Sequence, residues 1–226
     1  MKLPIILIDN GHGVNTPGKC SPDASAGRIA SPLYLREYSW ARRCAQGIVD
    51  ALQADGYTAF LLVKEEEDIP LKERTERVNA YCRRYGKDNV LLVSIHINAA
   101  GSDGKWHDAR GWSVYSSAGQ TVADKLATCL HDAAVVELEH SGYAGGKFSR
   151  WQKPVRTDYS DGDPDQEANF WILTKSACPA VLTENLFQDN KDDVEFLKSD
   201  KGLGALIALH ISGIEDFVKS LYKQAL

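Results

Sequence analysis

The hydrophobic positions of this chain fall into short unbroken apolar runs, separated by longer segments with apolar residues at helical spacing. One run covers residues 4–9 and another covers residues 90–95. Unbroken runs of this length are typical of strands buried on both faces. His12 follows the first run closely and His96 follows the second directly. Each run therefore predicts a strand with a histidine at its carboxyl end.

Helical spacing of apolar residues predicts helices over 33–54, 70–84 and 120–138, the second beginning at Pro70 as its first residue. The first of these helices has Glu37 near its start. A further apolar stripe, over residues 203–221, predicts a C-terminal helix that packs against the sheet.

Shorter apolar stretches predict further strands at 57–63, 111–115, 170–173 and 180–184. Because strands alternate with helices, the sequence predicts an α/β fold of the phosphorylase- or hydrolase-like kind. We expect a mostly parallel sheet of roughly six strands, covered by helices on both faces. The length fits a single domain, so residues 1–226 are expected to form one domain.

Residues 141–169 interrupt the alternation, because glycines and prolines recur through them. They predict a long loop, and long loops in compact domains are usually functional or mobile. Trp151 and Tyr159 make this loop a candidate rim for a peptide or glycan ligand, and a plain surface insertion is the alternative.

Composition and charge exclude several classes of function. The chain has 26 basic against 31 acidic residues, a net charge of -5, and its basic residues are scattered, which argues against nucleic acid as a partner. Its five cysteines are widely spaced and form no CxxC pair, which argues against a disulfide framework and against a cysteine-ligated zinc site.

Candidate chemistry gathers at the carboxyl ends of the predicted strands, where functional residues of open α/β sheets usually lie. His12, His96 and Glu184 map to such ends, and Glu37 joins them if the first helix begins at the same edge. Two histidines and one glutamate are an established ligand set for a catalytic zinc with an open position for water. We therefore predict His12, Glu37 and His96 as zinc ligands and Glu184 as the catalytic base.

Each of these residues also has a plainer interpretation. His12 can be a turn residue whose ring caps a backbone group, and His96 a half-buried imidazole. Glu37 can be a first-turn acid favoured by the helix dipole. Glu184 is harder to explain in that way, since it follows the apolar run 179–182, where an ionised carboxylate is costly without a metal or another partner.

Several motifs occur together in a fixed order. They are Ile8-Asp9-Asn10-Gly11-His12-Gly13, Glu37 opening a helix, Leu71-Lys72-Glu73-Arg74 with Asn79, Ser94-Ile95-His96-Ile97-Asn98-Ala99, Gly111-Trp112-Ser113-Val114-Tyr115, and Pro179-Ala180-Val181-Leu182-Thr183-Glu184-Asn185-Leu186-Phe187 with Asn190 and Asp192. In this order and spacing, the chain resembles the zinc-dependent N-acetylmuramoyl-L-alanine amidases of the type-3 family from Ile6 to about Phe217. The resemblance implies that His12, Glu37 and His96 bind zinc and that Glu184 is the catalytic glutamate.

The chain departs from the family pattern at three positions. Asn10 stands where a small residue is expected, Leu186 where a glycine is common, and Lys64 near where an arginine is often found. Residues 102–110 and 141–169 have no clear family counterpart. Arg74 either pairs with a carboxylate in the site or braces the fold. The remaining histidines are expected on the surface or in the core, and they are His107, His131, His140 and His210.

The resemblance implies hydrolysis of the amide between N-acetylmuramic acid and L-alanine in peptidoglycan, as in a phage endolysin or a bacterial cell-wall hydrolase. The expected partner is the muramoyl peptide, and the expected state is a monomer. Two alternatives stay open: a zinc peptidase or amidohydrolase acting on another amide, and a catalytically inactive wall-binding module. Retention of all four site residues argues against the inactive module.

The N-terminal apolar run is too short for the hydrophobic region of a signal peptide and ends at Asp9, so it predicts a strand. The sequence also contains no apolar stretch that predicts a membrane span. We expect either cytoplasmic accumulation, as for a phage lysin, or export with a leader that has been removed, with action on the bacterial cell wall in both cases.

Overall fold

The computed structural model describes residues 3–143 and 154–223, so Trp151 lies outside the described part of the chain. Its sheet has six strands in the order β2-β1-β3-β6-β4-β5. The strands are β1 (Ile5–Asn10), β2 (Thr58–Leu61), β3 (Val90–Asn98), β4 (Ser113–Ser116), β5 (Gln166–Glu167) and β6 (Ala180–Phe187). The first four in spatial order are mutually parallel, β4 runs antiparallel to β6, and β5 is parallel to β4. The predicted α/β class with a mostly parallel sheet is confirmed.

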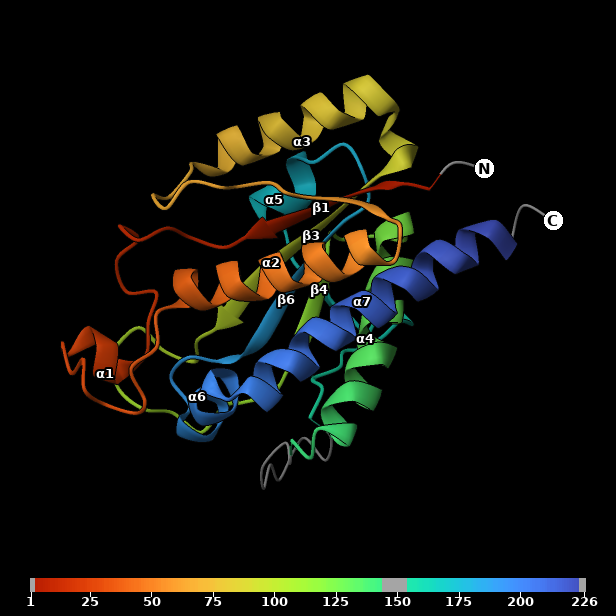
Figure 1. Cartoon of the computed structure of the whole chain (residues 1–226). Coiled ribbons are helices and arrows are strands. Elements are labelled where there is room, and N and C mark those ends of the chain that lie inside the picture. Colours follow the sequence, from red (N-terminus) through yellow and green to blue (C-terminus); the bar gives the residue numbers. More distant parts are fainter. Residues whose placement is uncertain (1–2, 144–153, 224–226) are drawn as a thin grey trace.

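Helices cover both faces of the sheet, as the alternation predicts (Figure 1). One face packs against α2 (Glu37–Ala54), α4 (Val122–His140) and α7 (Asp200–Lys223). The opposite face packs against α3 (Leu71–Tyr85) and the short α5 (Trp171–Lys175). Three short helices lie in connections: α1 (Pro22–Ser25), α6 (Lys191–Lys198) and the 3-10 turn η1 (Lys87–Asn89).

The unbroken apolar run of β1 follows from burial on both faces. Ile6 and Ile8 point into the core beneath α2 and α7, whereas Ile5 and Leu7 point into the core beneath α3. Successive side chains of a strand alternate between faces, so a central strand with both faces covered needs an apolar residue at every position.

Helix α2 begins at Glu37, four residues later than its apolar stripe predicts. The residues before it use their backbone groups elsewhere: Leu35 and Ser21 exchange hydrogen bonds, and Arg36 has an extended backbone that bridges to Cys20. Because these groups are already paired outside a helix, α2 starts where the chain leaves this contact.

The strand predicted at 170–173 is wrong. These residues open helix α5, with the Leu173 and Thr174 amides donating to the Phe170 carbonyl. A four-residue apolar run fits a buried strand and one buried helical turn equally well, so periodicity cannot separate them. The sixth strand is instead β5, which consists of the polar residues Gln166 and Glu167 and gives no hydrophobic signal.

Two further differences concern a helix end and an additional helix. Pro70 is the N-cap of α3 and not its first residue. Helix α6 was not predicted, because it is short and buries only one side of two turns through Val194 and Leu197, with the Asn190 side chain capping it by accepting from the Asp193 amide.

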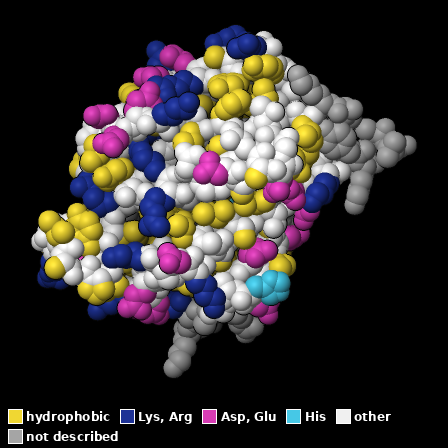
Figure 2. Space-filling model, in the orientation of Figure 1, with side chains coloured by type: hydrophobic (Ala, Val, Ile, Leu, Met, Phe, Trp, Pro, Cys, Tyr) yellow, Lys and Arg dark blue, Asp and Glu magenta, His cyan; other side chains and the backbone are white. Residues whose placement is uncertain are grey.

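The described parts of 141–169 contain no element longer than the two residues of β5, in line with the predicted long loop. None of the described helices combines the length and the apolarity needed to cross a bilayer. On the face drawn in Figure 2, basic and acidic side chains are interspersed.

We predict opposite effects of two glycine substitutions in α7. A Cβ at Gly213 would lie 2.7 Å from the Leu130 Cα of α4, whereas a Cβ at the exposed Gly204 meets nothing within 4 Å. Gly213→Ala should lower the free energy of unfolding by about 1–3 kcal/mol through overpacking. Gly204→Ala should raise it by about 0.5–1 kcal/mol through helix propensity. Urea denaturation measures both, and equal stability of the two variants would contradict the close α4–α7 packing.

Candidate active site

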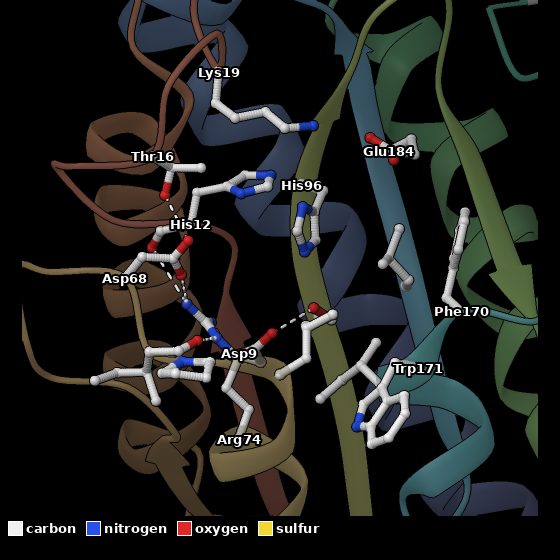
Figure 3. Close-up of a pocket in the computed structure, with 16 residues that line it drawn as sticks. Asp9, His12, Thr16, Lys19, Asp68, Arg74, His96, Phe170, Trp171 and Glu184 are labelled. Atoms are coloured by element: carbon white, nitrogen blue, oxygen red, sulfur yellow. Dashed lines mark hydrogen bonds and ion pairs between the residues drawn. The ribbon is translucent and has the colours of Figure 1, made fainter.

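The four predicted site residues lie at the carboxyl edge of the parallel strands (Figure 3). His12 follows the end of β1, His96 lies in β3 and Glu184 in β6, where it is the direct register partner of His96. Glu37 is the first residue of α2. The expectation that α2 begins at this edge is met, because the Glu37 carboxylate accepts a hydrogen bond of 3.0 Å from the Ile97 amide of β3.

His12, Glu37 and His96 form a compact cluster. Glu37 Oε1 lies 3.4 Å from His12 Nε2 and 3.2 Å from His96 Nδ1. The two imidazole rings are perpendicular, with centroids 4.9 Å apart. One ligand atom from each residue lies within 4.8 Å of the others, and this is the only such group of three or more potential metal ligands in the described part of the chain.

The Glu37 carboxylate is an ionised group in the interior. Its residue is 1% exposed, and burial alone would raise its pKa, but contact with His12 and His96 outweighs burial and holds the pKa well below its usual range. Its second oxygen, Oε2, is buried without a hydrogen-bond partner among the described residues. An orphaned carboxylate oxygen beside two imidazole nitrogens is a donor set that fits a zinc ion.

Glycines on both sides of His12 allow this close approach. His12 has a left-handed backbone, with a φ of 62°, which non-glycine residues adopt rarely and mostly at functional sites. A Cβ at Gly11 would lie 2.4 Å from the His96 ring, and one at Gly13 only 2.0 Å from the Asp68 amide. The Gly-His-Gly motif therefore has a steric basis.

Arg74 supports the His12 turn from below. Its guanidinium is 2% exposed and reaches Asp9 Oδ1 at 2.6 Å, the Asn10 carbonyl at 2.7 Å, Asp68 Oδ1 at 3.0 Å and the His12 carbonyl at 3.4 Å (Figure 3). The two roles left open for Arg74 are both filled, since it pairs with carboxylates beneath the site and braces the backbone that carries His12.

Glu184 faces His96 across the strand pair. Burial, reinforced by the charge of Glu37 and opposed by His96 and Lys19, raises the pKa of its carboxyl to about 7. Its Oε2 atom is buried with no hydrogen-bond partner among the described residues. A carboxylate with a pKa in this range can both accept and return a proton near neutral pH.

A hydrogen-bonded chain behind the sheet fixes the strands that carry His96 and Glu184. The Asn185 amide donates to the His96 carbonyl at 2.9 Å, and Trp112 Nε1 donates to Asn185 Oδ1 at 3.0 Å. His210 Nδ1 lies 2.6 Å from the Leu206 carbonyl, which only accepts, so Nε2 of the neutral ring accepts from the Thr183 hydroxyl at 2.9 Å. His210 is thus a core residue, as expected, but one that supports the site.

Leu186 occupies an unusual backbone position in β6. Its φ is 66°, its side chain is fully buried, and the pairing of β3 with β6 shifts register between His96 and Asn98. This departure from the family pattern falls at a left-handed position, where glycine carries no steric penalty.

A cavity of about 440 Å³ opens beside the cluster (Figure 3). His12, Lys19, His96 and Glu184 line it, together with other polar residues and an apolar wall. The wall includes Ile69, Pro70, Leu71, Phe170, Trp171, Ile172 and Leu182. Trp171 is 45% exposed, so its ring is available to a ligand.

The sequence did not reveal this apolar wall, because residues 170–173 were predicted to form a strand. The exposed, adjacent aromatic pair Phe170-Trp171 was the available signal. Tyr159, a candidate rim residue, is 64% exposed and is not among the described residues that line the cavity.

Comparison with known proteins agrees with this arrangement. A profile of the N-acetylmuramoyl-L-alanine amidase family matches residues 6–216. The chain belongs to this family. An endolysin of Bacillus phage SPP1 is 27% identical over 216 residues, covering 95% of this chain and 66% of the endolysin. The sporulation-specific N-acetylmuramoyl-L-alanine amidase of Bacillus subtilis strain 168 is 26% identical over 212 residues, covering 93% and 66%.

The chain thus spans slightly less than two thirds of the length of these curated relatives, at 66% each. Among solved structures, the N-acetylmuramoyl-L-alanine amidase of Clostridium difficile 630 superposes with a TM-score of 0.71 at 22% identity, covering 96% of this chain and 98% of that one. The amidase family and this solved structure therefore share the fold described above.

We predict that Arg74→Lys destabilises the protein far more than Arg77→Lys, its matched control on the same helix. Lysine keeps the charge but cannot satisfy the several buried acceptors of Arg74, which should cost about 1–3 kcal/mol per group left unpaired. Arg77 makes exposed ion pairs, which are worth at most about 1 kcal/mol. Similar urea midpoints for the two variants would contradict this bracing role.

Proposed function

We propose that residues 1–226 form one catalytic domain of a zinc-dependent N-acetylmuramoyl-L-alanine amidase. The reaction is hydrolysis of the amide that joins the lactyl group of N-acetylmuramic acid to L-alanine in peptidoglycan. The observation that carries this proposal is the convergence of His12, Glu37 and His96 into one cluster, with His12, His96 and Glu184 lining the same cavity. Membership of the family and the names of its relatives support the identity of the bond that is cut.

His12, Glu37 and His96 would hold the zinc ion through two imidazole nitrogens and a carboxylate oxygen. When bound, zinc lowers the pKa of a coordinated water towards ~7 and polarises a carbonyl group. The ionised state of Glu37 and its unpartnered Oε2 suit this role, because a metal ligand must be deprotonated.

Glu184 supplies the proton transfers. Its carboxylate takes a proton from the attacking water and passes it to the amine of L-alanine as the amide bond breaks. The raised pKa, about 7, lets Glu184 take up the proton of the water near neutral pH. The resulting carboxylic acid is still more acidic than the α-ammonium group of the product, so it can protonate the leaving amine. One residue thus serves first as base and then as acid.

The cavity gives the substrate two different surfaces. The polar side carries the reacting groups, and the apolar wall around Phe170 and Trp171 packs against the glycan or the stem peptide. We infer that this chain works on the bacterial cell wall, where its substrate is a polymer, and that it does so as a monomer.

Replacing Glu184 with Gln should leave zinc binding intact and lower wall hydrolysis by about 10²–10⁴-fold, since the amide cannot accept the proton. Glu139→Gln, an exposed change on α4, is the matched control and should hydrolyse walls like the unchanged protein. Zinc content and newly released L-alanine amino termini from purified walls are the measurements. Undiminished hydrolysis by the Glu184→Gln protein would remove this residue from the mechanism.

The same assay separates the alternative functions. An amidase releases L-alanine amino termini, a peptidase also releases free amino acids or internal termini, and a wall-binding module releases neither. Reducing sugar without amino termini would indicate a glycosidase and would contradict the proposal.

Removing the metal should abolish hydrolysis reversibly. We expect the chelator-treated protein to be inactive, to regain activity with one equivalent of zinc, and to bind zinc poorly after His96→Ala, because one of its three ligands is lost. His107→Ala, which changes a histidine outside the cluster, should bind zinc normally. Full activity of protein verified to be free of metal would overturn the zinc assignment.

A further inference from the structure

A loop rich in aspartate packs against the end of β4 and the start of α4, away from the cavity described above. Asp158, Asp161, Asp163 and Asp165 lie in this loop, within eight residues. Gln120, just before α4, donates weakly to Asp161 at 3.5 Å and to Asp163 at 3.3 Å. The loop leads directly into β5 and then into α5.

Asp165 is buried in a way that its protein neighbours do not explain. It is 2% exposed, and neither of its carboxylate oxygens has a hydrogen-bond partner among the described residues. Asp163 Oδ1 is also buried without a partner. The nearby Ser116 hydroxyl donates to the Ser117 carbonyl at 3.3 Å.

The charges around Asp165 make this burial more costly. Burial first, then the adjacent carboxyl of Asp163 and the charge of Asp124, raise the pKa of Asp165 well above its usual range, and the Ser116 hydroxyl only partly offsets this. A buried carboxylate with so few donors is expensive, and a second carboxylate facing it adds repulsion. Only a cation between the two groups, or a proton shared by them, removes this cost.

We propose that Asp163 and Asp165 bind a calcium ion that fastens this loop to the end of β4. The groups beside Asp165 offer oxygen atoms only: its own carboxylate, that of Asp163 and the Ser116 hydroxyl. Calcium takes several oxygen ligands in flexible geometry, whereas zinc prefers nitrogen and sulfur, and magnesium demands a near-ideal octahedron. Aspartates at alternate positions 161, 163 and 165 have the spacing with which calcium-binding loops begin, although Gln166 stands where the glycine of that pattern lies.

This site is separate from the His12, Glu37 and His96 cluster but connects to the cavity through the chain. Residues 166–167 form β5, and the next residues carry Phe170 and Trp171 of the apolar wall. Calcium at Asp163 and Asp165 fixes the segment that positions this wall.

The test is calorimetric titration of zinc-loaded, calcium-depleted protein with CaCl2 and, separately, with MgCl2. We expect one calcium per chain in the unchanged protein and loss of this binding in Asp165→Asn and in Asp163→Asn. Asp158→Asn, in the same loop, is the matched control, because its exposed carboxylate already accepts from the Ser160 amide. Calcium should also raise the melting temperature by several degrees in the unchanged protein and leave that of Asp165→Asn unmoved.

The shared-proton alternative gives a different result. If Asp165 is simply a neutral acid, the unchanged protein binds no calcium, and calcium leaves its melting temperature unchanged. Asp165→Asn mimics the neutral acid, so its melting temperature then equals that of the unchanged protein, with or without calcium. That outcome overturns the proposal, as does calcium binding that survives both substitutions. Should Asp165→Asn fail to fold, Asp163→Asn alone decides between these results.

Discussion

The buried carboxylate of Glu37 is the interaction on which the site depends. It is a negative charge in the interior, and it is stabilised from three directions: by the ring of His12 after β1, by the ring of His96 in β3, and by the backbone amide of Ile97. An ionised carboxylate at this depth persists only while these partners surround it. Its location fixes the start of α2 against the sheet and brings two histidines, far apart in sequence, into one cluster.

Arg74, which carries the opposite charge, stabilises the His12 turn from its other side. Glu37 holds the imidazole, and Arg74 holds the carbonyls of the backbone that carries it. The turn itself is conformationally unfavourable, with His12 in a left-handed backbone. Two buried charges of opposite sign, Glu37 in α2 and Arg74 in α3, thus hold the strained residue His12 from the two faces of the sheet. Both helices must therefore be packed before the site can form.

Much of this arrangement follows from the sequence, because two physical rules are strong. Apolar runs with both faces buried identify β1 and β3, and parallel strands bring their carboxyl ends to one edge, which is why His12, His96 and Glu184 converge. The rest depends on contacts that no local pattern encodes. The polar β5 pairs with β4, and the turn that begins at Phe170 is helical because the Leu173 and Thr174 amides donate to the Phe170 carbonyl. The unpartnered oxygens of Asp165 emerge only from three-dimensional burial.

At Leu186 the backbone conformation and the packing of the side chain favour different residues. Its left-handed backbone costs about 1–2 kcal/mol, which glycine would relieve. Its buried side chain contributes more, since emptying such a site typically costs about 2–5 kcal/mol. A single exchange to glycine is therefore unfavourable even though the backbone prefers it. The exchange becomes favourable only together with a second substitution, in which a larger neighbouring core residue refills the space. The effect of either substitution on stability therefore depends on the other.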